Sequence, residues 1–198
     1  MRASVSILAV LLLASQAIAT VVLTSRDLGG GIAELSYDAS QEASLVRAFA
    51  LDITVSPGII ISTDNWSSDY WVYPSQIIID PETGEIIDSS TPIASPDFPG
   101  TLGGLGTSGI TIEMGSLYDE ADPIHNTPPP VSGVLLTFTV SAECDVAVTE
   151  NLVRGGVILE DGTETDIYAP TTHIIPEPAT VLLLGLGGVA LLRKRKRN

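Results

Sequence analysis

The chain has 198 residues, few aromatic residues, one cysteine and a formal net charge of −15. Residues 20–175 contain only three basic residues but every acidic residue except Glu177, so their surface repels phosphate backbones and anionic polysaccharides. This charge argues against nucleic acid as a partner, and the single Cys144 excludes an internal disulfide.

Residues 1–19 have the layout of a secretory signal peptide. Arg2 supplies a positive charge, residues 7–13 form an uninterrupted apolar run, and residues 17–19 read Ala-Ile-Ala, a small-x-small cleavage triplet. The alternative is an N-terminal membrane anchor, but the apolar run is too short to span a bilayer about 30 Å thick. We therefore expect export, with a mature chain that begins near Thr20.

The body of the chain follows a period of two. In residues 46–55, Phe49, Leu51 and Ile53 share one face of an expected strand, while small or polar residues occupy the other. Turns rich in Pro, Gly and Asp separate such segments, and only residues 40–45 suggest a helical turn. We expect strands at 21–25, 32–37, 46–55, 59–62, 77–80, 110–114, 134–140, 146–149 and 157–160, with long loops at 89–109 and 119–130.

Many short strands with frequent turns predict an all-β fold, an antiparallel β-sandwich or jelly roll. The strand patterns of residues 45–56 and 133–149 resemble those of cohesin-type and related carbohydrate-binding-like sandwiches. This resemblance implies a jelly-roll topology, and it identifies no residue that contacts a partner.

An aromatic cluster is the sharpest local feature of the body. Trp66, Tyr70, Trp71 and Tyr73 all fall within nine residues. Exposed flat rings stack on the apolar faces of sugars, so these four residues are candidates for ligand binding. The alternative is that they fill the core, because large apolar side chains are more often buried than functional.

The acidic residues predict no definite metal site. Calcium prefers carboxylate oxygens, and two clusters offer them, although neither follows the alternating loop of an EF-hand. These clusters are Asp119-Glu120-Ala121-Asp122 and Glu160-Asp161 with Glu164 and Asp166. Because carboxylates are frequent in this chain, chance clusters are expected, and we predict no cofactor, with calcium as the alternative.

Nothing in the pattern points to catalysis. The two histidines, His125 and His173, lie in loop-like segments away from Cys144, and no zinc-ligand spacing or glycine-rich phosphate loop is present. A glycosidase needs two carboxylates that converge about 5–10 Å apart in a cleft, which spacing along a chain does not reveal. We therefore predict that the protein is not an enzyme.

The last two dozen residues have three parts. Pro176, Glu177 and Pro178 form a triplet that is followed by an uncharged stretch and then by a basic cluster. The uncharged stretch, 179–192, is shorter than the roughly 17–25 residues of a spanning helix, so we expect a marginal span that leaves the basic cluster in the cytoplasm. Its apolar and small residues are Ala179, Val181, Leu182, Leu183, Leu184, Gly185, Leu186, Gly187, Gly188, Val189, Ala190, Leu191 and Leu192, and the basic cluster is Arg193, Lys194, Arg195, Lys196 and Arg197.

These three parts resemble, in order and spacing, the PEP-CTERM sorting signal of exported bacterial proteins. The resemblance implies recognition by an exosortase, a membrane transpeptidase that cuts near the triplet, and a setting of extracellular polysaccharide or biofilm material. The alternative is an ordinary single-pass anchor with a chance Pro-Glu-Pro.

The expected organisation is a signal peptide (1–19), an acidic sandwich (20–168), a linker (169–175) and a sorting signal with a hydrophobic helix (176–198). The expected function is that of a non-catalytic envelope or matrix protein, held in the membrane before processing and at the cell surface or outside afterwards. The alternative is a carbohydrate-binding or cohesin-like recognition module.

Overall fold

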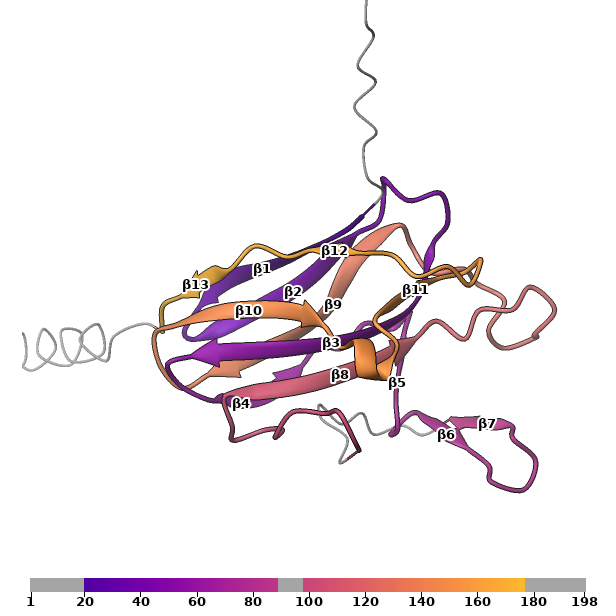
Figure 1. Ribbon diagram of the computed structural model, residues 1–198, viewed down its shortest axis with the longest axis horizontal. Coiled ribbons are helices and arrows are strands. Elements are labelled where there is room, and N and C mark those ends of the chain that lie inside the picture. The colour runs from indigo at the N-terminus through magenta and orange to yellow at the C-terminus, as the bar shows by residue number, and fades with distance from the viewer. Residues whose placement is uncertain (1–19, 89–97, 177–198) are drawn as a thin grey trace, which may run out of the picture.

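The computed structural model describes residues 20–88 and 98–176, and these form a β-sandwich (Figure 1). One sheet has five strands in the order β12 (Ile167–Tyr168), β1 (Val21–Gly29), β2 (Ile32–Asp38), β9 (Ser132–Val140) and β4 (Ile60–Asp64). The other has six: β13 (Thr172–Ile174), β10 (Cys144–Glu150), β3 (Val46–Ser56), β8 (Gly109–Gly115) and β5 (Trp71–Val72), with β11 (Val157–Leu159) also paired to β3. The predicted fold class is confirmed.

A small hairpin stands apart from the two sheets. It consists of β6 (Ile77–Ile79) and β7 (Ile86–Asp88), which pair only with each other. Within the two large sheets the pairs are antiparallel, except that β12 runs parallel to β1.

The alternation in the sequence decides which side chains enter the core. On β3, Phe49, Leu51 and Ile53 are at most 1% exposed and face the five-stranded sheet across the interior. Tyr37, Phe49 and Tyr70 meet edge to face, with ring centroids 5.1–5.8 Å apart. Burial of these faces supplies the main stabilising free energy of a domain without disulfides.

Two crossings close the open sides of the sandwich. Between β4 and β5 the chain passes from the five-stranded to the six-stranded sheet, and Trp66 packs against the core on the way. On the opposite side the chain passes from β12 to β13, so the two sheets are joined there as well. Thr20 and Pro176 consequently lie at opposite ends of the strands, because β1 starts at one end and β13 finishes at the other.

Two local expectations differ from the structure. The segment 169–175 is not a linker, because it contains β13, which pairs with β10 and buries Ile174 completely. A three-residue strand has too few positions for its period to be visible in the sequence. Residues 40–45 form a turn rather than a helical segment, closed by a hydrogen bond from the Glu42 amide to the Ala39 carbonyl.

The predicted signal peptide (1–19) and the predicted hydrophobic helix (179–192) lie outside the described residues. Among residues 20–88 and 98–176, no helix has the length and apolar character needed to cross a membrane.

Candidate functional site

A short irregular segment interrupts the edge of the six-stranded sheet and creates two hollows. Residues 151–156, which include the 3-10 turn η1 (Leu152–Arg154), separate β10 from β11, although both strands pair with β3. Ala50 of β3 holds both ends of this segment, since its carbonyl accepts a hydrogen bond from the Asn151 amide and its amide donates one to the Gly156 carbonyl. Gly155 and Gly156 both have positive φ, so the reversal requires glycine there.

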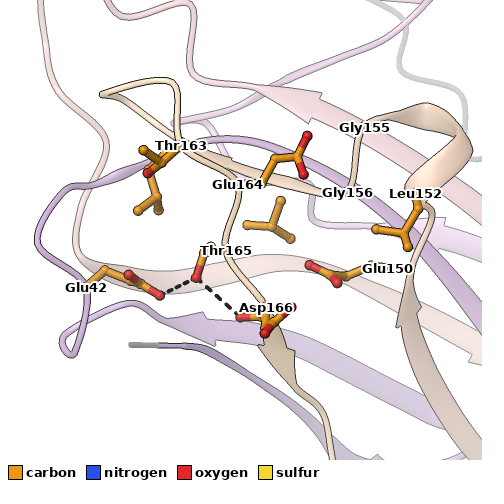
Figure 2. Close-up of a pocket in the computed structure, with 11 residues that line it drawn as sticks. Glu42, Glu150, Leu152, Gly155, Gly156, Thr163, Glu164, Thr165 and Asp166 are labelled. Carbon is orange, nitrogen blue, oxygen red and sulfur yellow. Dashed lines mark hydrogen bonds between the residues drawn. The ribbon is translucent and has the colours of Figure 1, made fainter. Parts of the chain in front are cut away.

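The larger hollow, here named the acidic cleft, has a volume of about 510 Å³. Four carboxylates line it: Glu42 from the turn after β2, Glu150 from the end of β10, and Glu164 and Asp166 from the segment before β12. Figure 2 shows Glu42 and Glu150 extending into the cleft from opposite sides. The remaining lining is apolar or hydroxylic: Leu152, Gly155, Gly156, Val157, Leu159, Thr163 and Thr165.

Burial gives Glu150 a distinct chemistry. Loss of hydration raises the pKa of its carboxyl group above the ordinary value, and the nearby charges of Asp166 and Glu164 raise it further. Glu42 is held in place by the Thr165 hydroxyl, which donates to its carboxylate (Figure 2). No basic side chain lines the cleft, so it suits a ligand that brings positive charge or many hydroxyl groups.

The smaller hollow, the aromatic hollow, lies on the other side of residues 151–156 and has a volume of about 250 Å³. Arg154 forms a bidentate ion pair with the buried Glu113, with 3.0 Å between Nη2 and Oε2. Its guanidinium lies 5.9 Å from the ring centroid of Tyr73 and 5.6 Å from that of Phe98, and these rings are stacked. The Arg154 charge is therefore already paired with a carboxylate and covered by aromatic faces.

A buried polar network fixes both hollows to the sheet. Asp52 accepts from the Thr111 hydroxyl at 2.6 Å and from the Asn151 amide at 3.0 Å, and Asn151 also donates to the Gly100 carbonyl. The amide of Leu102 donates to Thr111. Because Thr111 and Asn151 are buried and these groups are hydrogen-bonded, the network fixes the start of the 151–156 segment and residues 100–102 to the sheet.

The four residues of the aromatic cluster go to different environments. Tyr70 is 2% exposed, and its hydroxyl donates to the Val46 carbonyl in the core, where burial raises its pKa. Trp66 is half-buried against the core, and Trp71 meets the His125 ring edge to face at 5.4 Å. Of the four, only Tyr73 lines either of the two hollows described above, so these residues do not form one continuous stacking surface.

The two acidic clusters considered for calcium are used mostly for local structure. Asp119 and Asp122 accept from the backbone amides of Ala121 and Ile124, and Asp122 also contacts His125. Glu160 accepts from Arg47 and Ser116, which turns it away from Glu164 and Asp166 in the acidic cleft. Within the described ranges, no group of three or more His, Cys, Asp or Glu side chains is arranged to hold a metal ion.

Cys144 is buried and paired in register with Ile174, and burial raises the pKa of its thiol. His173 lies on the adjacent strand but is exposed, and its ring contacts Asp145 and Glu143 rather than the thiol. This arrangement offers no activated thiolate.

The sequence singled out two of the four cleft carboxylates, Glu164 and Asp166, within an acidic cluster, but it did not join them to the other two. Glu42 and Glu150 lie far apart along the chain, and only the pairing of β3 with β10 and β11 brings their surroundings together. Arg154 was visible as a rare basic residue, but its partner Glu113 lies on β8, and the sequence does not show that the two side chains meet.

The sorting triplet begins on the sandwich itself. The amide of Ile175 donates to Asp27 Oδ2 at 2.9 Å, and Pro176 packs against Gly31, where an added Cβ atom would lie 3.4 Å from the Pro176 Cβ atom. Glu177, Pro178, the apolar stretch and the basic cluster lie outside the described residues.

Comparison with known proteins identifies this end of the chain. Residues 175–197 match the family described as the PEP-CTERM protein-sorting motif, which covers the expected triplet, apolar stretch and basic cluster. No curated protein matches the chain.

Among solved structures, the chain is similar to a chain in the crystal structure of a CaDoc0917–CaCohA2 complex. The identity is 16%, the TM-score is 0.39, and the match covers 79% of this chain and 99% of the other. It is also similar to the solution structure of CaCohA2 from Clostridium acetobutylicum, with 16% identity, a TM-score of 0.38, and coverage of 80% and 91%.

Proposed function

We propose that the protein is an exported, non-catalytic component of the cell envelope or extracellular matrix, delivered as a substrate of an exosortase-type transpeptidase. The observation that carries the proposal is the PEP-CTERM sorting motif at residues 175–197, attached directly to a folded acidic sandwich. The apolar stretch holds the chain in the membrane only until it is processed, and the sandwich is the mature product.

Mass spectrometry of the protein from its native host tests this function. We expect a mature N-terminus near Thr20 and a mature C-terminus at or near the triplet, with the apolar stretch removed. Glu177→Gln is expected to reduce processing, whereas Glu82→Gln in an exposed turn serves as the matched control. A chain that keeps Asn198 and stays embedded in the membrane, in a host with an active exosortase, would contradict the proposal.

A second candidate function is ligand recognition, and the acidic cleft is the observation that favours it. The cleft combines four carboxylates with apolar patches around an open hollow, which suits a cationic or polyhydroxyl ligand. The aromatic cluster is a weaker candidate for binding, because its residues lie in separate environments. The same cleft contains Glu150 with a raised pKa, the feature that a carboxylate-dependent hydrolase would need.

A glycan array that includes neutral and amino-sugar oligosaccharides distinguishes recognition in the acidic cleft from recognition by the aromatic cluster. Loss of binding in a Glu150→Gln, Glu164→Gln double variant, with binding kept in Trp71→Ala, supports recognition in the cleft. The reverse result assigns recognition to the aromatic cluster. Cleavage of a bound oligosaccharide by the wild type, but not by Glu150→Gln, would replace both with a hydrolase.

A further inference from the structure

The end of the sandwich from which the sorting motif leaves has few charged residues, and those at its border, Asp27 and Glu143, are hydrogen-bonded to Ile175 and His173. Four segments meet there, residues 28–32, 56–61, 104–108 and 140–142, and none contains Asp, Glu, Lys or Arg. We name these segments together with Ile175 the signal-proximal end. In Figure 1 it is the end near β13, where the chain continues into the grey trace.

Hydrogen bonds join these loops into one surface. Ile60 exchanges backbone hydrogen bonds with Gly106 and Thr107, each at 2.8 Å. The Ser141 amide donates to the Ile59 carbonyl at 3.0 Å, and the Val140 amide donates to the Gly31 carbonyl at 2.8 Å. The loops therefore keep a common arrangement instead of moving separately.

This surface exposes branched aliphatic side chains. Six of them expose between 39% and 51% of their area: Leu28, Ile32, Ile59, Ile61, Leu105 and Ile175. Ile32 and Ile61 lie on β2 and β4, the two neighbours of β9, while Leu28 lies near the end of β1, Ile175 follows β13, and Ile59 and Leu105 lie in loops. The nearest charged groups are engaged in pairs: Asp27 accepts from the Ile175 amide, and Glu143 and Asp145 contact His173. A group of exposed aliphatic residues of this size marks a surface that contacts something apolar.

The chain itself indicates what the surface contacts. Pro176 is packed on Gly31, and the apolar stretch begins only three residues later, at Ala179. Three extended residues span at most about 11 Å. The headgroup layer of one leaflet is about 6 Å thick, so a sandwich tied this closely to an inserted stretch has its signal-proximal end within about 5 Å of the lipid headgroups even when the three residues are fully extended.

The charge distribution agrees with this placement. Glu42, Asp69, Asp119, Glu160 and Asp166 belong to loops at the opposite end of the strands. The nine residues of β9 separate the two ends by about 30 Å, several times the Debye length of about 8 Å at physiological ionic strength. Anionic lipids at the signal-proximal end are therefore shielded from these five carboxylates, and the nearer ones, Asp27, Glu143 and Asp145, are hydrogen-bonded to the Ile175 amide and to His173.

We propose that the signal-proximal end is a membrane-contacting surface, on which Leu28, Ile32, Ile59, Ile61, Leu105 and Ile175 rest in the interface of the lipid bilayer before the sorting signal is removed. This inference rests on the proposed function, because it requires the apolar stretch to be inserted. The sandwich then holds the triplet at the depth of the headgroups, with its orientation set by the fold rather than by a flexible linker.

The test uses the full chain in vesicles of phosphatidylethanolamine and phosphatidylglycerol. Cys144→Ser removes the only native thiol, and a single cysteine at Ile61→Cys or Ile79→Cys carries an environment-sensitive fluorophore. Ile61 is 51% exposed and Ile79, on the separate hairpin, is 54% exposed, so they form a matched pair. We expect headgroup spin-labelled lipid to quench most of the fluorescence at position 61 and to leave position 79 unchanged.

The other outcomes are distinguishable. If the chain floats with the vesicles but position 61 is quenched no more than position 79, insertion holds and membrane contact is overturned. If the chain fails to float, the membrane step of the proposed function fails, and the contact fails with it. If the fluorescence at position 61 changes with the concentration of unlabelled chain but not with the quencher, the surface contacts a second copy of the chain. That outcome overturns the proposal. Leu105→Cys repeats the measurement should Ile61→Cys fail to fold.

Discussion

The two ends of the sandwich share the same strands but differ in charge and in construction. The signal-proximal end has short glycine-containing turns, exposed aliphatic residues and the start of the sorting motif. The opposite end carries most of the carboxylates in longer loops and contains the acidic cleft. Because the strands keep these ends apart, one domain can present an apolar surface to the membrane and an acidic surface to its surroundings. Four predictions test this contrast.

The largest effect is expected where β13 completes the signal-proximal end. Ile174 is fully buried and the adjacent Ile175 is 50% exposed, so the two positions form a natural pair. Ile174→Ala should lower the free energy of unfolding by about 2–5 kcal/mol because it leaves a cavity in the core. Ile175→Ala should change the free energy of unfolding by less than about 0.5 kcal/mol. Urea denaturation measures both, and equal effects would show that β13 is not part of the folded domain.

The next effect concerns the contact between the sandwich and the sorting motif. Gly31 has a φ of +78°, and an added Cβ atom would lie 3.0 Å from the Val140 carbonyl oxygen. Gly31→Ala should cost about 2–3 kcal/mol, from backbone strain and from this close contact. Gly30→Ala has the same kind of φ, +65°, but open space around it, and should cost only about 1 kcal/mol. Thermal unfolding measures the stability of the two variants. Equal losses of stability would contradict the predicted close contact between a Cβ atom at position 31 and the Val140 carbonyl oxygen.

At the acidic end, the effect depends on pH. The pKa of Glu150 is raised in the folded state, so the fold binds its proton more tightly than the unfolded chain does. Stability is therefore greatest when Glu150 is protonated and falls as the pH rises through the raised pKa. Glu150→Gln should remove this loss and stabilise the protein at neutral pH by about 0.5 kcal/mol after solvent screening. Denaturation at pH 5 and pH 7 tests this, and a pH dependence unchanged from the wild type would contradict it.

The smallest effect returns to β13. Asp145 and then Glu143 raise the pKa of the exposed His173, so their pairing is fully present below pH 6.5 and is lost as the pH rises through the raised value. Amide hydrogen exchange in β13 should be slower at pH 5.5 than at pH 8 after correction for the intrinsic rate, and His173→Gln should abolish the difference. High salt should also reduce this pH-dependent difference in exchange, because it screens the ion pairs of His173. A pH-dependent difference that survives in His173→Gln would assign the protection to other groups.

The regular strands were predictable because their alternation is long enough to read. Residues 46–55 show four apolar positions on one face, Phe49, Leu51, Ile53 and Val55, and β3 follows them closely. The short strands β6 and β11 were predicted within 77–80 and 157–160, but β5, β7, β12 and β13 were not, since two or three residues carry little periodicity and their pairing depends on the strands beside them. Pairing with β10, for example, turns the expected linker into β13.

The candidate sites divide in the same way. The sorting motif was predicted from local order and spacing, and the match to residues 175–197 confirms it. The environments of Tyr70 and Trp71 were not predictable, because neighbouring positions near an edge strand face opposite sides. Glu42 and Glu150 line the acidic cleft from segments that are distant along the chain, and no local pattern indicates that they share one hollow.

The sequence by itself determined the fold class, the acidity of the body and the sorting motif, because composition, short periods and contiguous motifs are local properties. Tertiary structure alone decided that β13 belongs to the sandwich, that carboxylates from three segments border one cleft, and that four uncharged loops meet where the motif begins. Each of these depends on strand pairing between residues that are distant along the chain. Such pairings are non-local contacts, so no single segment of the sequence contains the information that specifies them.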